Sequence, residues 1–248
     1  MCTAVIYKNF KSQWPFIISF NRDEFFSRKT LSPKRHWNKY PHILAGKDLK
    51  KGGTWFGVND YGIFVCILNR NANKNIIKKF NTSRGTLVLD ILKEKNLEKA
   101  KNKISTYFTL KNYNGFNIVI SDYKNSYYYT HDSSSKKINI TKIIEGISVI
   151  TNESCNNFKE KKIKEYYNYF KKIPSPNPEK NNWNEWSKLM IKKINLNKVS
   201  LNQNSFFNMS NLYGLVSCSQ LALSTNNEYI YRYSYKHPFD KNFRKINE

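Results

Sequence analysis

Hydrophobic and polar residues alternate with two different periods along the chain, and these periods divide it into blocks of strands and pairs of helices. Short runs rich in β-branched and aromatic residues, bounded by Gly, Pro, Asn or Asp, predict strands. Apolar residues that recur every three or four positions predict helices. We therefore expect strands at 2–8, 16–20, 42–46, 52–59, 61–69, 116–122, 126–131, 137–141, 146–151, 212–224 and 228–235, and helices at 83–94, 96–108, 157–173 and 182–194.

The order of these elements is strands, two helices, four strands, two helices and two strands. Hairpin-linked strands that alternate with paired helices are typical of antiparallel sheets covered by helices, which is an α+β fold. One stretch, "IPSPNPEKNN" at 173–182, has the composition of a flexible linker, but the strand pattern resumes after it. We therefore predict a single domain over residues 1–248.

The net charge of +24 raises the question of a nucleic-acid partner. Only seven of the 42 basic residues are arginine, the residue whose planar guanidinium suits bases and phosphates best. Lysine is spread along the whole chain beside abundant Asn, Ile, Tyr and Phe, which share A/T-rich codons. Genome composition explains this pattern, and we predict no specific nucleic-acid partner.

Cysteine and histidine usage predicts neither a metal site nor a bound cofactor. The four cysteines form no CxxC pair and the four histidines are scattered, so no zinc or haem-attachment spacing is present. No apolar run reaches the length that a membrane span needs. The N-terminus "MCTAVIYKNF" lacks the features of a signal peptide, so we expect a cytoplasmic protein with reduced thiols.

The strongest chemical signal is Cys2, which directly follows Met1. Because Cys is small, we expect removal of Met1, which leaves a thiol and a free amine with a reference pKa of about 8 on one Cα. The amine can accept the proton of the thiol, so one residue supplies both nucleophile and base. The alternative is an accidental small residue, since free cysteine usually behaves as a small hydrophobe.

The first predicted hairpin brings polar residues to this position. If Lys8 pairs near Phe16, antiparallel pairing places Cys2 opposite Arg22, within the polar segment 21–24. Arg22 would lower the pKa of the thiol, and the carboxylate of Asp23 could anchor the ammonium group. The alternative is that segment 21–24 is a solvated loop.

Several motifs together resemble the NRDE-motif family, the group that includes transport and Golgi organisation protein 2. They are "MCTAVIY", "FNRDEFFSR", "GGTWFGVNDYG", "LNR" and "SRGTLVLDIL", while "RHW", "FNIVISD" and "YGLVSCSQLALS" resemble its bacterial branch. The resemblance runs in order from residue 1 to about residue 225. It implies a four-layer αββα sandwich of antiparallel sheets, of the N-terminal-nucleophile hydrolase type.

The resemblance also implies a set of site residues. Cysteine amidohydrolases that cleave conjugated bile salts and penicillin V use an N-terminal Cys, an early Arg and Asp, and a later Thr-Asn pair. In this chain "ITNES" is similar to the later pair, which makes Asn152 a candidate oxyanion donor. Arg22 and Asp23 match the early pair, although they are adjacent here and spaced in those enzymes. The catalytic candidates are thus Cys2, Arg22, Asp23 and Asn152, with a strand-end turn as the alternative for Asn152.

Three functional hypotheses follow, and the third is electrostatic binding of nucleic acid without sequence preference, through the positive charge. The first is a hydrolase-like protein with an N-terminal cysteine nucleophile that acts on an amide or acyl bond of a small molecule. The second is a non-catalytic protein that binds or traffics haem or lipid, which the resemblance also implies. Two further segments bear on the site: we interpret Gly52-Gly53 as a tight bend, and Asn69 and Arg70 could face the pocket of Cys2.

Overall fold

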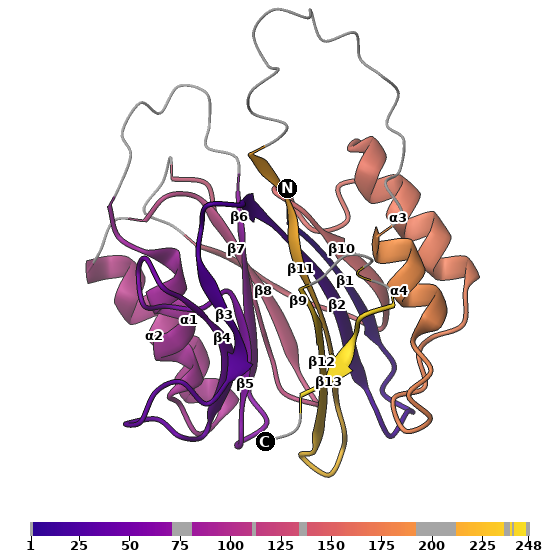
Figure 1. Cartoon of the computed structure of the whole chain (residues 1–248), viewed down its shortest axis with the longest axis horizontal. Helices are drawn as coiled ribbons and strands as arrows, with labels where there is room; N and C mark the ends of the chain where they lie inside the picture. The colour runs from indigo at the N-terminus through magenta and orange to yellow at the C-terminus, as the bar shows by residue number, and fades with distance from the viewer. Residues whose placement is uncertain are drawn as a thin grey trace, which may run out of the picture.

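The computed structural model describes residues 2–70, 81–110, 113–133, 138–191, 212–235, 239 and 241–246. Two antiparallel sheets stack face to face, and a pair of helices covers the outer face of each (Figure 1). The predicted αββα sandwich is therefore confirmed. None of the described helices combines the length and apolar character that a membrane span requires.

The first sheet has six strands and carries the N-terminus. Its order is β10 (Gly146–Ile150), β1 (Thr3–Lys8), β2 (Phe16–Phe25), β11 (Tyr213–Leu223), β12 (Tyr229–Ser234) and β13 (Arg244–Lys245). Helices α3 (Lys161–Lys172) and α4 (Asn184–Ile191) pack on its outer face (Figure 1). The last three residues of the predicted helix 182–194 lie outside the described residues.

The second sheet has seven strands in sequence order. They are β3 (Thr30–Lys34), β4 (Ile43–Asp48), β5 (Phe56–Asn59), β6 (Phe64–Asn69), β7 (Phe116–Ser121), β8 (Ser126–His131) and β9 (Asn139–Lys142). Helices α1 (Arg84–Leu92) and α2 (Leu97–Leu110) cover it. The α1 residues predicted to share one face, Leu87, Val88, Ile91 and Leu92, are all buried.

Strand alternation assigns each side chain of β1 to one of two cores. Ala4 and Ile6 belong to the core between the two sheets, whereas Val5 packs with α3 and α4 on the outer face. The predicted hairpin register is confirmed, since Lys8 pairs with Phe16 and Thr3 pairs with Asn21. Cys2 also packs against the inter-sheet core, so its side chain lies on the same face as Ala4.

The polar segment 21–24 is not a solvated loop. It continues β2, which ends at Phe25 and not at residue 20 as predicted. The reason is long-range pairing: β11 runs along the whole of β2, from Leu223 opposite Phe16 to Tyr213 opposite Phe25. Asn21 and Arg22 are consequently buried.

Candidate active site

Cys2 immediately precedes β1 and lies beside the polar end of β2. The β1–β2 pairing ends at Thr3 and Asn21. Cys2 and Arg22 are the next residues along these two segments. The Sγ of Cys2 donates a hydrogen bond to the carbonyl oxygen of Asp23, at 3.5 Å. The predicted adjacency of Cys2, Arg22 and Asp23 is therefore present in the structure.

Arg22 is a buried cation that is held from two sides. Its side chain lies over the ring of Trp55, with the guanidinium carbon 4.3 Å from the ring centre. One of its nitrogens is 3.7 Å from a carboxylate oxygen of Glu24. An aromatic face and a carboxylate both stabilise a guanidinium that has lost most of its water.

A cavity of about 300 Å³ opens between the sheets at this end of the sandwich. Cys2, Arg22 and Asp23 all line it, and so does Asn69, as expected. Its charged lining comprises the cations Arg22, Arg28, Lys51 and Arg84 and the acids Asp23, Glu24 and Asp48. A polar, charged cavity of this size suits a small polar ligand.

Ion pairs fix part of this lining. Arg28 donates through Nε to Asp48, at 3.1 Å, and through Nη2 to the same carboxylate oxygen. Burial would raise the pKa of Asp48, but the hydrogen bonds from Arg28 and from the Lys50 N–H hold that pKa below its usual value. Asp48 is therefore ionised at neutral pH.

The thiol of Cys2 is not acidic in this environment. Burial raises its pKa and outweighs the opposing effects of the hydrogen bond to the Asp23 carbonyl and of the charge of Arg22. Arg22 thus acts in the predicted direction, but the net shift is upward. With Met1 attached, the nitrogen of Cys2 is an amide, so this pKa belongs to the unprocessed chain.

Asn152 lies apart from the cavity lining. It follows β10 by two residues, and β10 flanks β1 with Ile150 opposite Ala4, on the side of β1 away from Arg22. Its side chain is largely buried, and among the described residues it does not line the cavity of Cys2. Three of the four sequence candidates therefore line the cavity, and continuing the β1–β10 register by two residues from Ala4 and Ile150 sets Asn152 beside Cys2, on the side opposite Arg22.

The turn that carries Asn152 is tied to the second sheet. The amide nitrogen of Asn117 donates to the carbonyls of Thr151 and Glu153, at 2.9 and 2.8 Å. Arg70, which was expected to face the pocket, instead donates to Asn117 Oδ1 at 3.4 Å and to Ser154 Oγ at 3.2 Å. Arg70 thus supports this turn and is absent from the cavity lining.

Arg84 and Trp55 are site residues that the sequence reasoning did not identify. Arg84 is the first residue of α1 and donates from Nη1 to the carbonyl of Gly115, at 2.7 Å, while burial lowers the pKa of Arg84.

Close backbone contact positions α1: a Cβ on Gly53 would lie 2.3 Å from the carbonyl carbon of Gly85. Gly53 and Gly85 were the features of the sequence that could have indicated this close contact. Gly52, with φ +72°, makes the predicted bend.

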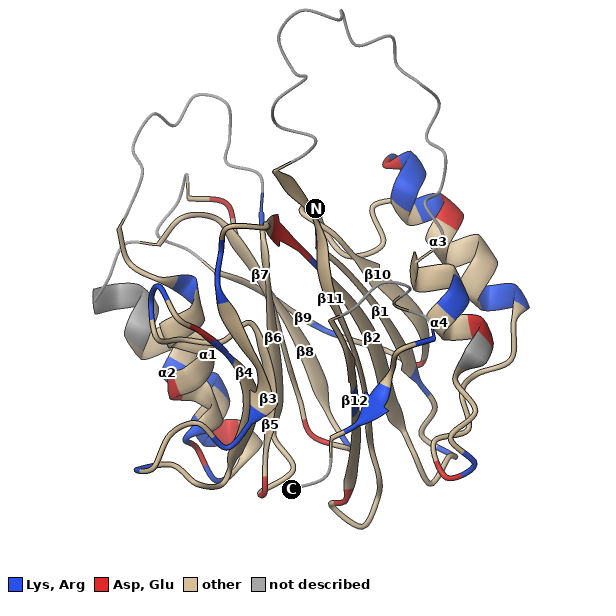
Figure 2. Cartoon of the chain, in the orientation of Figure 1, with Lys and Arg blue, Asp and Glu red and all other residues tan. Residues whose placement is uncertain are grey.

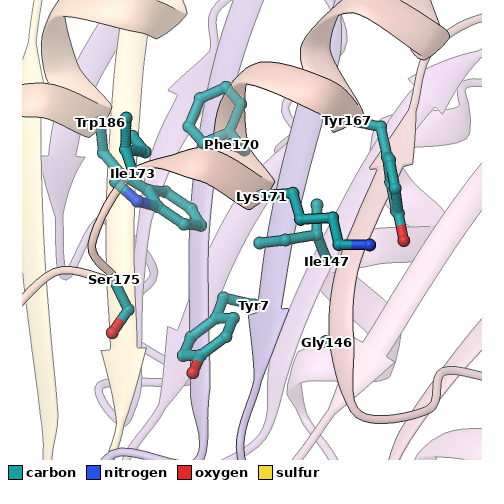
Figure 3. A pocket seen from close by; sticks show the side chains of 9 residues that line it. All are labelled: Tyr7, Gly146, Ile147, Tyr167, Phe170, Lys171, Ile173, Ser175 and Trp186. Carbon is teal, nitrogen blue, oxygen red and sulfur yellow. The ribbon is translucent and has the colours of Figure 1, made fainter.

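A second cavity, of about 260 Å³, lies on the outer face of the six-stranded sheet under α3 and α4 (Figure 3). Tyr7, Tyr167, Phe170 and Trp186 form its walls, and Lys171 extends across it toward Tyr167. Its described lining contains no Cys, His, Asp or Glu, so it offers neither a thiol nucleophile nor a carboxylate base. Of these two cavities, only that of Cys2 has a thiol among its described lining residues.

Basic residues are distributed over the helices of both outer layers and over strand ends (Figure 2). The helix α3 carries a dense group of them, Lys161, Lys162, Lys164, Lys171 and Lys172.

Comparison with known proteins gives a family match over most of the chain. A family model described as "Transport and Golgi organisation 2" matches residues 1–234. A human protein, "Transport and Golgi organization protein 2 homolog", is 32% identical over 117 residues, which is 45% of this chain and 40% of the relative. The Drosophila melanogaster "Transport and Golgi organization protein 2" is 33% identical over 81 residues, or 31% of this chain and 28% of the relative. The matched stretches thus cover less than half of either relative.

Solved structures share the fold at low sequence identity. A conjugated bile acid hydrolase from Clostridium perfringens is similar with a TM-score of 0.54 and 16% identity, over 99% of this chain and 92% of that one. The Caenorhabditis elegans ortholog of N-acylethanolamine-hydrolyzing acid amidase is similar with a TM-score of 0.55 and 14% identity, over 99% and 100%. The chain therefore shares its αββα sandwich fold with these two proteins.

Proposed function

The chain belongs to the Transport and Golgi organisation 2 family, and on that premise we propose that it is a hydrolase-like protein whose N-terminal cysteine attacks an amide or related acyl bond of a small molecule. The observation that carries this proposal is the position of Cys2, which lines a charged cavity beside Arg22 and Asp23. The names of two similar structures, a bile acid hydrolase and an acid amidase, support an amide as the bond attacked.

The proposed reaction begins with removal of Met1, which frees the α-amine of Cys2. That amine accepts the thiol proton, and the thiolate attacks the substrate carbonyl carbon to form a tetrahedral oxyanion. The ammonium then returns the proton to the leaving amine as the C–N bond breaks, which leaves a thioester on Cys2. Water attacks the thioester, the same amine again moves the proton, and the acid product leaves with the thiol restored.

The neighbouring residues have distinct proposed roles. The carboxylate of Asp23 holds the terminal ammonium, and Arg22 fixes the end of β2 against Trp55. Asn152, which the continued β1–β10 register sets beside Cys2, is our candidate for the oxyanion donor. The amide of Asn69, which lines the cavity, is the rival donor.

A second function, the binding or trafficking of a small molecule such as haem or a lipid without turnover, is favoured by one observation. In the chain that retains Met1, burial raises the pKa of the Cys2 thiol, so without processing this thiol lacks the lowered pKa of an activated nucleophile. A carrier would bind its ligand with equal affinity before and after removal of Met1, because it needs no free amine. Haem titration tests this version: a saturable Soret shift that Arg22→Met abolishes would favour it.

Adduct mapping tests the proposed hydrolase. The purified chain that begins at Cys2 is mixed with a small activated ester, and acylated peptides are identified by mass spectrometry. We expect one acyl group per chain, on Cys2, with none on the matched variant Cys2→Ala and an unchanged yield on Cys155→Ala. Acylation spread over Cys66, Cys155 and Cys218 with Cys2 unmodified would overturn the proposal.

We also propose that residues 1–248 form one domain and that the protein is cytoplasmic. The family match over residues 1–234 supports the first statement. Limited proteolysis checks it, since a two-domain chain would yield two stable fragments. Cell fractionation with an antibody against the chain checks the second.

A further inference from the structure

Two side chains converge on one backbone oxygen beside the candidate nucleophile. The carbonyl oxygen of Asp23 accepts a hydrogen bond from the hydroxyl of Tyr213 at 3.0 Å and from the thiol of Cys2 at 3.5 Å. A carbonyl oxygen has two lone pairs and can accept both donors, and the charge of Cys2 acts directly on the phenol of Tyr213. Tyr213 is therefore a hydroxyl neighbour of the thiol, contributed by a strand that lies 190 residues beyond Asp23 in the sequence.

The position of Tyr213 is fixed by packing. Its ring meets that of Phe25 edge to face, with centroids 5.2 Å apart, and the two residues are partners in the β2–β11 ladder. The same ladder shifts register between Leu215 and Ser217, beside Asp23. Such an irregularity interrupts regular backbone bonding and leaves a carbonyl accessible to side-chain donors.

The hydroxyl of Tyr213 remains a donor whenever Cys2 is able to ionise. Burial raises the pKa of Tyr213, and the nearby charges of Cys2, Asp23 and Glu24 raise it further. The phenol is thus protonated over the range in which a thiol titrates. A neutral donor that can rotate its proton is well suited to a neighbouring group that changes charge.

Ionisation of Cys2 changes which bonds are possible. A thiolate has no proton to give to the Asp23 carbonyl, and a sulfur anion gains from any donor within reach. We propose that Tyr213 is a positioning residue for Cys2, whose hydroxyl turns from the Asp23 carbonyl to the ionised sulfur and stabilises it. This proposal rests on the proposed role of Cys2 as the nucleophile, and it adds a supporting residue from β11.

Other charged or titratable groups also act on this sulfur and must be held constant in a test. They are Arg22 and Asp23 on β2, Arg84 on α1, Lys162 on α3 and Cys66 on β6, together with the terminal amine. A phenylalanine at position 213 keeps all of them, the ring and its contact with Phe25. Only the hydroxyl is removed.

The pH profile of alkylation isolates the effect of that hydroxyl. Iodoacetamide reacts with a thiolate by displacement of iodide, and the rate at Cys2 is read from the mass of its peptide between about pH 5 and about pH 10. On the chain that begins at Cys2, we expect Tyr213→Phe to raise the midpoint by about one pH unit and to slow alkylation at pH 7 about tenfold. Tyr61→Phe, which changes an exposed tyrosine in the turn between β5 and β6, is the matched control and should leave the profile unchanged.

A second variant keeps the proposal open to refutation if Tyr213→Phe folds poorly. Phe25→Leu keeps the hydroxyl but removes the ring that holds Tyr213, and Phe25 is exposed enough for the change to be tolerated. We expect a smaller shift in the same direction. The proposal is overturned if folded Tyr213→Phe keeps the wild-type midpoint of alkylation. If Tyr213→Phe does not fold, a wild-type midpoint in Phe25→Leu overturns it. It is also overturned if Cys2 is not alkylated at any pH.

The outcome is separable from that of the proposed function. A shifted alkylation midpoint without any acyl transfer from an ester would support the role of Tyr213 and refute the hydrolase. Acyl transfer with an unshifted midpoint would support the hydrolase and refute the role of Tyr213.

Discussion

The guanidinium of Arg22 lies over the ring of Trp55, with its central carbon 4.3 Å from the ring centre, and this contact joins the two sheets next to Cys2. Arg22 extends the strand that pairs with β1, whereas Trp55 immediately precedes a strand of the other sheet. The end of β2 is thereby held against the opposite layer. Residues at this junction should affect the reactivity of Cys2 more than the stability of the fold.

The planar shape of Arg22 should matter as well as its charge. Lysine keeps the charge but cannot stack a planar group on Trp55 or hold the same contact with Glu24. We expect Arg22→Lys to slow acylation of Cys2 about tenfold, and Arg22→Met to slow it further. Stopped-flow acylation with an activated ester measures both, with Arg35→Lys as the control. Full activity in Arg22→Lys would show that charge alone suffices.

The backbone contact between Gly53 and Gly85 should tolerate no side chain. A Cβ at position 53 would lie 2.3 Å from the Gly85 carbonyl carbon and 2.6 Å from the Thr86 nitrogen, and backbone atoms cannot move aside cheaply. We expect Gly53→Ala to lower the free energy of unfolding by about 2 kcal/mol, measured by urea denaturation.

The neighbouring glycine provides the control for that experiment. Gly52 has φ +72° and open space around it, so Gly52→Ala adds backbone strain without a clash. Its cost should be about 1 kcal/mol. If the two variants lost equal stability, close packing of α1 against Gly53 would not be the reason for glycine there.

Asn152 should affect acyl transfer but not alkylation, because only acyl transfer forms an oxyanion. We expect Asn152→Ala to slow acylation of Cys2 by about 100-fold while its reaction with iodoacetamide keeps the wild-type rate. Asn69→Ala is the matched comparison, since Asn69 already lines the cavity. An unaffected Asn152→Ala together with a slow Asn69→Ala would transfer the oxyanion role to Asn69.

Lys8, at the far end of β1, should make stability depend on pH. It is fully buried, donates to Ser126 Oγ at 3.0 Å, and burial lowers its pKa to about 8. Because this pKa lies below that of an unfolded lysine, the unfolded chain binds more protons between the two values. The free energy of unfolding should therefore rise as pH increases from about 8 to about 10.5, by an amount on the order of 2 kcal/mol.

Replacement of this lysine should remove the dependence. We expect Lys8→Met to be more stable than wild type near pH 7 and to lack the rise between about pH 8 and about pH 10.5. Urea denaturation at several pH values measures the difference, with the exposed Lys11→Met as control. An identical slope in wild type and Lys8→Met would assign the pH dependence to other groups.

Features set by local sequence could be predicted well. The short connection between Lys8 and Phe16 and the alternation of apolar residues determine the first hairpin, so the pairing of Thr3 with Asn21 could be derived in advance. The helical face of α1 follows in the same way from the spacing of Leu87, Val88, Ile91 and Leu92. Strand β3 was not predicted, because Pro33 and its polar neighbours lack the apolar pattern of a strand. It is an edge strand, where proline is tolerated.

Features set by contacts between distant segments could not be predicted. The continuation of β2 through Asn21 and Arg22 depends on β11, which lies about 200 residues further along the chain. The same holds for Trp55 under Arg22 and for Arg84 at the cavity, since each comes from the other sheet or its helix. The upward pKa shift of Cys2 is also tertiary, because burial outweighs the charge of its neighbour Arg22.

The most direct test of the central claim compares Cys2 with and without its own amine. One chain is prepared to begin at Cys2 and another retains Met1, each verified by intact mass, and both are mixed with the same activated ester. We expect Cys2 to be acylated rapidly in the chain that begins with it and to remain unmodified when Met1 is present. Equal acylation rates in the two chains would contradict the claim that the terminal amine serves as the base for Cys2.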